Sequence, residues 1–314
     1  MKIIVTGGAG FIGSHTVDAL IDAGHKVVVL DDLSTGHKEN INHKAAFHKA
    51  DLRDDVLQEI FAEEKPDAVY HLAAQVKVVK SINDPVFDLE VNLGGTINLL
   101  DACRKNNVKK IIYSSTGGAV YGEPDPDDLP INEKYILNPL SFYGIHKHTV
   151  EHYLYLFKVN YGLNYTILRY PNIYGPRQDP HGEAGVIAIF SIKLLDGSRP
   201  TIFGDGSKTR DYLYVEDVVR ANLLVLDKGD GEIFNIGWGF GIRDDEVFKD
   251  IRDAIGCRIE PINANHRTGE VVHICLDSSK IRTQLGWKPL VDFKEGVRRS
   301  VEFYRKRPAW IKAF

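Results

Sequence analysis

Short apolar runs alternate with longer stretches of helical periodicity through the first half of the chain. The runs fall at residues 2–5, 27–30, 46–50, 68–72, 110–113 and 165–169. The helical stretches lie near residues 13–23, 54–64, 86–106 and 142–161. A strand buried on both faces reads as a nearly continuous apolar run, which is typical of parallel sheets. The alternation of strand and helix therefore predicts an α/β protein with a Rossmann-type, doubly wound parallel sheet.

A glycine-rich turn connects the first predicted strand to the first predicted helix. The stretch Thr6-Gly-Gly-Ala-Gly-Phe-Ile-Gly13 contains the G-x-G-x-x-G pattern, and Gly7, Gly10 and Gly13 are spaced three apart. Glycines allow a tight turn, close approach of the backbone to a pyrophosphate and close packing of helix on strand. The helix N-terminus then presents free N–H groups to the phosphates. This turn, between strand and helix, predicts a dinucleotide site.

Acidic residues at the ends of the next two strands indicate which dinucleotide binds. Asp31 lies 18 residues after Gly13, at the end of the second predicted strand, and Asp32 follows it. A carboxylate at this position accepts hydrogen bonds from the adenosine ribose and repels a 2′-phosphate, which predicts NAD and not NADP. Asp51 ends the third predicted strand, where it can bind an adenine amino group. Aspartate at a strand end is also a common turn residue, so this second assignment is weaker.

The pattern of elements loosens beyond about residue 175, where prolines and glycines interrupt it. A helix at 215–226 and a strand at 233–236 still continue the pattern of the first half. We therefore expect an NAD-binding domain at 1–175, completed by about 212–238. Residues 176–211 and 239–314 are expected to form mainly a smaller, interleaved substrate-binding domain.

Composition and charge narrow the possible partners and the compartment. The net charge of -4 and the pI near 6.3 give no basis for binding nucleic acid or an anionic membrane. No apolar run is long enough to span a membrane, and the first strand begins too early for a signal peptide. The three cysteines, Cys103, Cys257 and Cys275, are too widely spaced for a disulfide framework or a metal motif. We therefore expect a cytoplasmic protein without a metal site.

A tyrosine and a lysine supply the candidate chemistry. Tyr143 and Lys147 are four residues apart in the helical stretch 142–161 and so share one face. A nearby ammonium group favours the phenolate form of tyrosine, which can then take a proton from an alcohol. The fifth predicted strand runs into hydroxyl side chains, Ser114 to Thr116, which can bond the same substrate oxygen. Beside NAD, this set predicts hydride transfer between an alcohol and a ketone.

Longer stretches of the chain resemble a known group, the extended short-chain dehydrogenase/reductases, and within them the UDP-sugar 4-epimerases. The matching stretches are VTGGAGFIGSH at 5–15, DDLSTG at 31–36, HLAAQ at 71–75, VNLGGT at 91–96, SSTGGAVYGE at 114–123, YGIHK at 143–147, LRYPNIYGPRQDPHGEAGV at 168–186, IFGDGSKTRDYLYVEDV at 202–218, FNIG at 234–237 and LGW at 285–287. They cover nearly the whole chain, and their combination is far more specific than any single motif.

The resemblance implies a role for each matching residue. Thr116, Tyr143 and Lys147 would be the catalytic hydroxyl, the base and the cofactor-anchoring lysine. The residues implied to bind NAD are Gly7, Gly10, Phe11, Ile12, Gly13, Asp31, Asp32, Ser34, Thr35, Gly36, Asp51, Leu52, Leu72, Ala73, Ala74, Gln75, Asn92, Ser114, Tyr143, Lys147 and Tyr170. Those implied to hold a UDP-sugar are Thr116, Tyr143, Asn172, Gly185, Val186, Phe203, Arg210, Tyr212, Arg267 and Glu270.

The residue types agree with such a substrate. Arg210 and Arg267 offer planar, bidentate donors for a diphosphate, and Phe203 can stack on uracil. The resemblance implies NAD-dependent 4-epimerisation of a UDP-hexose, such as UDP-glucose or UDP-galactose, through a transient 4-keto sugar. Because no net oxidation occurs, NAD would stay bound and be recycled. A UDP-N-acetylhexosamine or a UDP-hexuronate remains an alternative. Ile274, which its place before Leu276 and Asp277 puts near the sugar 2-substituent, is mid-sized and leaves open whether an N-acetyl group fits.

Other activities of the same scaffold are weaker alternatives. A nucleotide-sugar 4,6-dehydratase needs an Asp-Glu pair just after the catalytic hydroxyl residue, and a decarboxylase is expected to carry a Glu there. This chain has Gly117 and Gly118, which cannot transfer protons. A non-catalytic NAD-binding regulator is also possible on this fold. The intact set of Thr116, Tyr143 and Lys147 argues against it.

Two helical stretches, 86–106 and 142–161, are apolar nearly all round, which predicts burial on both sides. Members of the group are usually homodimers, so we expect these helices to form a four-helix dimer interface. His148 and His152 have the spacing of metal ligands, but no carboxylate or cysteine partner is evident. We therefore expect these histidines to lie at the interface or in the core.

Overall fold

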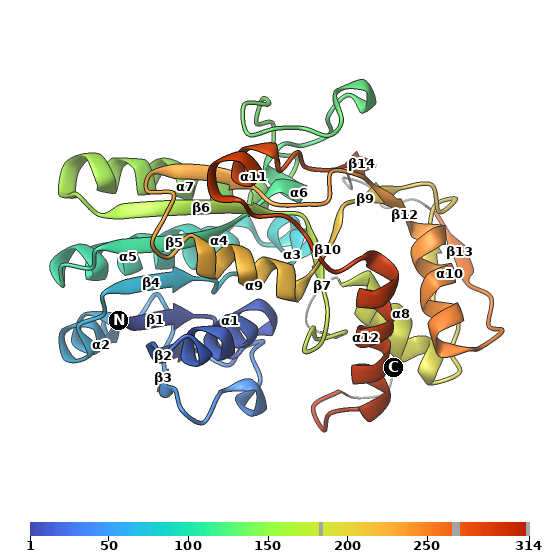
Figure 1. The fold of residues 1–314 in the computed structure, drawn as a ribbon, viewed down its shortest axis with the longest axis horizontal. Coiled ribbons are helices and arrows are strands. Elements are labelled where there is room, and N and C mark those ends of the chain that lie inside the picture. Colours follow the sequence, from blue (N-terminus) through green and yellow to red (C-terminus); the bar gives the residue numbers. More distant parts are fainter. Residues whose placement is uncertain (182–184, 266–270, 312–314) are drawn as a thin grey trace.

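The computed structural model describes residues 1–181, 185–265 and 271–311. Its centre is a seven-stranded parallel sheet with the order β11-β6-β5-β4-β1-β2-β3 (Figure 1). The strands are β1 (Lys2–Thr6), β2 (Lys26–Asp31), β3 (Ala46–Lys49), β4 (Ala68–His71), β5 (Lys110–Thr116), β6 (Asn164–Tyr170) and β11 (Glu232–Asn235). The order changes direction between β1 and β4, so the predicted doubly wound sheet is confirmed. Ligands of such sheets bind beyond the carboxyl ends of the strands at this switch point.

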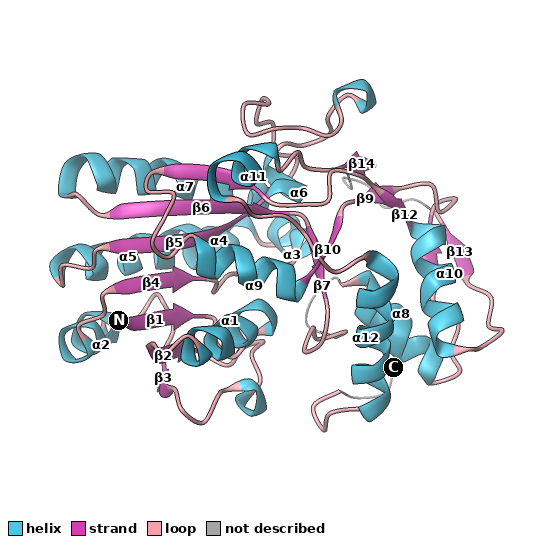
Figure 2. Cartoon of the chain, in the orientation of Figure 1, coloured by secondary structure: helices cyan, strands magenta, loops and turns pink. Residues whose placement is uncertain are grey.

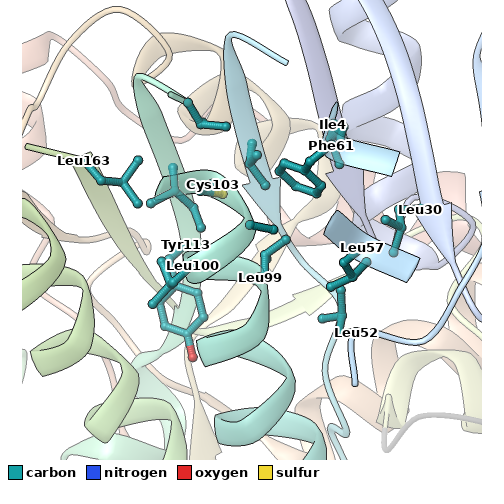
Figure 3. Close-up of a cluster of buried hydrophobic side chains, with 14 of the residues drawn as sticks. Ile4, Leu30, Leu52, Leu57, Phe61, Leu99, Leu100, Cys103, Tyr113 and Leu163 are labelled. Atoms are coloured by element: carbon teal, nitrogen blue, oxygen red, sulfur yellow. The ribbon is translucent and has the colours of Figure 1, made fainter. Parts of the chain in front are cut away.

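Both faces of the sheet are buried, as the continuous apolar runs predict. In β1, Ile4 faces one hydrophobic cluster, while Ile3 and Val5 face the other. Figure 3 shows part of the first cluster, where Ile4 lies beside Phe61. The helices over this face are α2 (Val56–Glu64), α5 (Gly95–Lys105) and α7 (Phe142–Tyr161), and those over the other face are α1 (Phe11–Asp22), α9 (Val215–Leu224) and α11 (Ser279–Leu285). Each large side chain buried in this way contributes roughly 1.5–3 kcal/mol to stability.

The helical stretch predicted at 86–106 is confirmed, but its middle is not α-helical. After α3 (Val78–Asn83), the chain forms α4 (Pro85–Asp88), a π-helical segment η2 (Leu89–Gly94) and then α5 without a break. The wider π turn carries Asn92, whose side-chain amide is hydrogen-bonded in both directions to the backbone of Gln75. Such π turns are frequent at functional sites and leave no distinct trace in apolar periodicity.

The remaining elements lie mostly beyond one end of the large sheet (Figure 1). Figure 2 shows that their strands are short and that helices provide most of their mass. These elements are β7 (Asn172–Tyr174), α8 (Val186–Leu195), β8 (Thr201–Phe203), β9 (Thr209–Arg210), β10 (Tyr212–Tyr214), β12 (Ile242–Arg243), α10 (Asp244–Ile255), β13 (Ile262–Ala264), β14 (His273–Ile274) and α12 (Phe293–Lys306). They share a separate apolar core, which includes Phe190 of α8, Val247 of α10 and Val301 of α12. Short helical turns complete the chain: α6 (Gly117–Val120), η1 (Lys38–Asn40) and η3 (Pro126–Asp128).

A buried ion pair joins α7 to the sheet. Glu151 of α7 accepts hydrogen bonds from Arg169 Nε (3.0 Å) and Nη2 (2.5 Å) and from Ser115 Oγ (2.6 Å). Arg169 also donates to the hydroxyl of Tyr121 (2.8 Å). Burial alone would raise the pKa of the Glu151 carboxyl, but nearby His148 and the hydrogen bonds from Arg169 and Ser115 bring it down to about 2. Because both charges are buried and hydrogen-bonded, losing one partner costs far more than losing both.

We expect R169M to lower the free energy of unfolding by about 3–5 kcal/mol at pH 7, because it leaves a buried carboxylate unpaired. The double variant E151L/R169M should recover most of this loss. Since the pKa of Glu151 is depressed in the folded state, the pair stabilises fully above about pH 4.5. That contribution is lost as the pH falls towards 2, so the cost of R169M should shrink there. Urea unfolding followed by circular dichroism measures both effects, and a cost below 1 kcal/mol at pH 7 would contradict the expectation.

Candidate active site

A pocket of about 240 Å³ opens at the carboxyl ends of β1, β4, β5 and β6. It lies at the switch point of the sheet, where dinucleotides and their substrates bind in doubly wound folds. The predicted site residues that line it are Phe11, Ile12, Leu72, Ala74, Ser114, Thr116, Tyr143, Lys147, Tyr170, Asn172, Gly185, Val186 and Tyr212. The structure thus brings together cofactor, catalytic and substrate residues that the sequence distributes over more than 200 positions.

The glycine turn joins β1 to α1 with backbone packed directly on backbone. Gly7 has φ 69°, in the left-handed region that favours glycine. A Cβ at Gly7 would lie 2.7 Å from the backbone nitrogen of Ala73, and one at Gly13 would lie 2.0 Å from the Gly7 carbonyl oxygen. Gly10 is the N-cap of α1, where no side chain satisfies the first N–H groups. These N–H groups are available to an anion, which fits the pyrophosphate of a dinucleotide.

Asp31 stands beside this turn at the end of β2. Its carboxylate accepts hydrogen bonds from the N–H groups of Ala9 (3.0 Å) and Leu33 (2.8 Å). Burial raises the pKa of the Asp31 carboxyl, and these two hydrogen bonds oppose that shift. A Cβ at Gly36 would lie 2.8 Å from Asp31 Oδ1, so the following loop closes tightly around the carboxylate. The carboxylate thus has the place and the fixed orientation that an adenosine ribose needs.

The neighbouring predicted residues are placed less directly. Asp32 accepts hydrogen bonds from the backbone N–H (2.8 Å) and the hydroxyl (2.7 Å) of Ser34, so it shapes the loop that also contains Thr35. Asp51 is bonded to the guanidinium of Arg53, with Oδ2 2.5 Å from Nη2. Leu52 is buried in the apolar cluster. Adenine binding by Asp51 therefore stays a prediction that would require Arg53 to share the carboxylate.

A chain of hydrogen bonds holds the loop that follows β4, residues 72–77, which we call the cofactor loop. Thr96 Oγ1 donates to the Asn92 carbonyl (2.6 Å) and therefore accepts from Nε2 of His71 (2.8 Å). Burial lowers the pKa of His71 to about 3, so the ring is neutral and its Nδ1 accepts from Thr6 Oγ1 (2.9 Å). Thr6 Oγ1 in turn accepts from the N–H of Ala73 (3.2 Å). This network, from which the tautomer is assigned, ties the loop to β1 and to η2.

The cofactor loop is held on its other side by the predicted residues Gln75 and Asn92. Asn92 Oδ1 accepts from the Gln75 N–H, and Asn92 Nδ2 donates to the Gln75 carbonyl, both at 2.9 Å. This amide pairing fixes the backbone of the loop one residue beyond Ala74, which lines the pocket. These two residues act on the site through the loop that they hold.

The catalytic residues of the sequence prediction meet at the pocket. Ser141 caps α7 by accepting from the N–H of Gly144 (3.1 Å), and this cap fixes the first turn of the helix that carries Tyr143 and Lys147. Both side chains line the pocket, as does Thr116 at the end of β5. Tyrosine, lysine and a hydroxyl therefore surround one cavity, which is the arrangement that proton transfer from an alcohol requires.

The surroundings of Lys147 determine its charge. Its Nζ lies 4.4 Å from the centre of the Tyr113 ring, an attractive contact for a cation. Burial lowers the pKa of Lys147 to about 7, against the opposing influence of Glu151 and Asp88. Tyr113 is itself buried, and its hydroxyl has no hydrogen-bond partner among the described residues. Burial thus disfavours the Lys147 ammonium, while the Tyr113 ring and the two carboxylates favour it.

The far wall of the pocket comes from the second half of the chain. Asn172 of β7 and Tyr212 of β10 are register partners, which explains how residues 40 positions apart line one cavity. Gly185 precedes α8, and Val186 is its first residue. Tyr170 also lines the pocket, and its hydroxyl is bonded to Asn222 Oδ1 (2.6 Å).

Four predicted substrate residues are not placed at this wall. Phe203 ends β8 and does not line the pocket. The guanidinium of Arg210 donates to the backbone carbonyls of Thr209, Val271 and Val272. Arg267 and Glu270 lie outside the described residues. Their contacts with a substrate stay predictions.

The sequence interpretation missed several residues of the pocket wall, including Val76, Tyr174, Gln178 and Ile187. Tyr174 ends a short strand just before Gly175, the same kind of strand end that singled out Asn172. This position at a strand end is a signal by which Tyr174 can be found from the sequence. The others depend on how the second half of the chain folds back, which no local pattern shows.

The paired histidines of α7 do not complete a metal cluster within the described ranges. The prediction that His148 lacks a carboxylate neighbour is wrong, because Glu151 Oε2 lies 3.6 Å from its Nδ1. Glu151 is committed to Arg169, however, and no group of three or more His, Cys, Asp or Glu residues in residues 1–181, 185–265 and 271–311 is arranged to hold a metal ion. In these same ranges no helix combines the length and the apolar character needed to cross a bilayer.

Fold and site together define a dinucleotide-binding enzyme scaffold with a short-chain dehydrogenase type of Tyr-Lys site. The sequence signature of the NAD dependent epimerase/dehydratase family matches residues 3–237. The chain belongs to this family, which confirms the predicted family, the NAD cofactor and an enzyme of the epimerase type.

Individual relatives match over nearly their whole length. The chain is 50% identical, over 96% of its length and 98% of the relative's, to a putative UDP-glucose 4-epimerase of Methanocaldococcus jannaschii. A solved UDP-glucose 4-epimerase of Thermotoga maritima, with UDP-glucose, is 49% identical with a TM-score of 0.95, covering 98% of this chain and 99% of that one. A Thermus thermophilus UDP-glucose 4-epimerase in complex with NAD is 43% identical with a TM-score of 0.94, covering 98% and 100%.

We expect G7A to lose most of its bound NAD, because the added methyl group would push the loop at Ala73 away from the turn. G24A is the matched control, since Gly24 also has a positive φ (85°) but nothing within 4 Å of its Cβ position. Both variants carry the same kind of backbone strain, about 1–2 kcal/mol. NAD released from the denatured purified proteins, measured enzymatically, should be low only for G7A. Equal NAD content in the two variants would contradict this reading of the turn.

Proposed function

We propose that this protein interconverts UDP-glucose and UDP-galactose by NAD-dependent epimerisation at C4 of the sugar. The observation that carries the proposal is the meeting of Thr116, Tyr143 and Lys147 in a pocket beside the glycine turn. The substrate class comes from the relatives, which are named UDP-glucose 4-epimerases, one of them solved with UDP-glucose. Residues 176–211 and 239–314, apart from α11, form the substrate-binding part in this proposal.

The residues of the site fit NAD. The glycine turn leaves no room for side chains and offers free N–H groups at α1, while Asp31 presents a fixed carboxylate beside it. Phe11, Ile12 and Leu72 would enclose the cofactor from the turn and the loop after β4. Bound NAD would supply a reversible hydride acceptor for C4 of the sugar, which leaves no net redox change.

The chain's own residues handle the proton. Tyr143, as phenolate, takes the proton of the sugar 4-hydroxyl, and Thr116 shares the hydrogen bond to the same oxygen. The Lys147 ammonium lowers the cost of the phenolate, and the Tyr113 ring below it keeps this ammonium in place. After the resulting 4-keto sugar turns over in the pocket, C4 regains its hydride on the opposite face, which inverts its configuration, and Tyr143 returns the proton to the 4-oxygen.

The positions after Thr116 distinguish epimerisation from dehydration. A Cβ at Gly117 would lie 2.3 Å from Leu276 Cδ1, so no acidic side chain fits there without displacing Leu276. A Cβ at Gly118 would make ordinary van der Waals contacts, with Asn172 Oδ1 at 3.8 Å and Thr116 Oγ1 at 3.9 Å. Because both positions are glycine, neither supplies a second acid or base to eliminate water from the 4-keto sugar.

The test is conversion of UDP-galactose to UDP-glucose by purified protein without added NAD. We expect turnover with the wild type, and Y143F should keep its NAD but lose at least 10³-fold in kcat, because proton transfer is lost. Y155F, at an exposed tyrosine of the same helix, is the matched control and should behave as wild type.

The same assay separates the alternatives. Conversion of UDP-N-acetylgalactosamine or UDP-galacturonate in preference to UDP-galactose would move the substrate assignment to that class. Bound NAD without turnover of any UDP-sugar would favour an NAD-binding regulator. Near-wild-type turnover by Y143F would exclude the assigned base.

We also propose that the protein is a cytoplasmic homodimer. The helices α3 and α4 pack beside α7, and all three expose apolar side chains. The exposed residues are Val79 on α3, Val86 on α4, and Ile145, Leu156 and Val159 on α7. Such a face on paired helices is typical of a protein–protein interface. The three cysteines are free, which fits a reducing compartment.

We expect the wild type to sediment at about twice the 35.2 kDa of the chain at micromolar concentration. L156D should shift it to the monomer, because a two-fold interface would bury the new charge twice. L290D is the control, since Leu290 is similarly exposed but lies away from these helices. A monomeric wild type would refute the dimer.

A further inference from the structure

A fully buried carboxylate, Asp88, lies behind the cofactor loop at the end of α4 and is 0% exposed. Its Oδ1 accepts hydrogen bonds from Gln75 Nε2 (2.6 Å) and Asn92 Nδ2 (3.0 Å). These are the two residues that hold the backbone of the loop lining the pocket. The carboxylate therefore orients both amides at once, and neither amide can rotate without losing a buried hydrogen bond.

The second oxygen of Asp88 reaches the catalytic helix. Oδ2 lies 2.6 Å from Nδ1 of His146, whose side chain is also buried. Because the carboxylate can only accept, Nδ1 carries the hydrogen in this contact. His146 is adjacent to Lys147 and one turn beyond Tyr143 on α7. One buried carboxylate thus connects the loop after β4 with the helix that carries the catalytic pair.

We infer that Asp88 is a positioning residue that couples the placement of NAD to the placement of Tyr143 and Lys147, with His146 as its contact on α7. The inference rests on the proposed function, because it assigns a role in that same reaction. In hydride transfer the donor carbon, the base and the cofactor must be aligned closely, and small displacements are costly in rate. A link through one side chain keeps the loop and the helix at a fixed separation.

The chemistry of Asp88 suits this task better than a neutral residue would. Its two oxygens accept three donors from three separate segments, at residues 75, 92 and 146. Charge-assisted hydrogen bonds of this length are stronger and more directional than neutral ones. The charged groups nearest to it on the catalytic side are Lys147, whose ammonium it favours, and Glu151 further along α7.

Two pairs of variants test the inference. D88N keeps an acceptor for Gln75 and Asn92, and its amide NH₂ can donate to His146 once that ring changes tautomer, whereas D88L removes every acceptor. H146N places an amide NH₂ on Cγ, where Nδ1 is attached in histidine, whereas H146F removes the donor to Asp88 and leaves the loop contacts intact. D217L is the control, because Asp217 is equally buried and accepts from backbone N–H groups, but it lies outside the pocket.

Each variant is purified and measured for bound NAD, thermal midpoint, kcat and KM with UDP-galactose. We expect D88L to retain less than a tenth of the wild-type NAD content and H146F to retain NAD but lose at least tenfold in kcat with unchanged KM. H146N should stay within threefold of wild type, and D88N, which keeps acceptors for both amides but loses the charge, should retain most of its NAD and lose less than tenfold in kcat. D217L should be destabilised but should bind NAD normally, which separates a positioning role from general loss of stability.

The inference is overturned if D88L keeps its NAD and H146F keeps its kcat, or if D217L loses NAD as D88L does. Failure of the proposed function looks different, because the wild type itself would then convert no UDP-sugar. In that case NAD content alone decides: loss in D88L with retention in D88N supports the role of Asp88, and equal content in both overturns it.

Discussion

Close backbone contact at the Gly7 turn sets the geometry on which the rest of the site depends. β1, the start of α1 and the loop after β4 meet there without a side chain between them, since a Cβ on Gly7 or Gly13 would overlap neighbouring backbone atoms. The position of the loop therefore follows from the parallel register of β1 and β4, which ends at Thr6 and His71. The pairing of β1 with β4 therefore also fixes the positions of the N–H groups at the start of α1, which are available to the phosphates of the dinucleotide.

Hydrogen bonds between buried polar side chains connect the turn to the neighbouring segments and hold those segments in fixed positions. An unpaired buried donor or acceptor costs about 1–3 kcal/mol, so a network whose members are all paired has few alternative arrangements. His71 joins Thr6 to Thr96, and Asn92 joins the π turn to Gln75. The exception is Tyr113, whose buried hydroxyl has no hydrogen-bond partner in the described part of the chain. Its ring lies against Lys147, and this contact with the cation offsets part of the cost of the unpaired hydroxyl.

Periodicity and spacing predicted what is local in this molecule. The strands, most helices and the glycine turn follow from runs of apolar residues and from the conformational freedom of glycine, and Tyr143 and Lys147 share a helix face by spacing alone. The π turn at 89–94 and the bond between Asp88 and His146 were not predictable in this way. Polar partners 58 positions apart leave no period in the sequence, and their pairing depends on helices that cross only in the folded chain. The carbonyl partners of the Arg210 guanidinium were likewise not predictable from the sequence, and its contact with a diphosphate stays a prediction.

In the proposed reaction, whether the 4-keto sugar is reduced to the epimer or loses water also depends on packing between distant segments. Leu276, from the second half of the chain, occupies the space that a side chain at Gly117 would need. An acid-base pair at this point would require exchange of both Gly117 and Gly118 and a shift of the Leu276 side chain, whose Cδ1, Cδ2 and Cγ atoms all lie within 3.1 Å of a Cβ at Gly117. The absence of side chains after Thr116 and the packing of Leu276 therefore favour the same proposed outcome, which is reduction of the 4-keto sugar without loss of water.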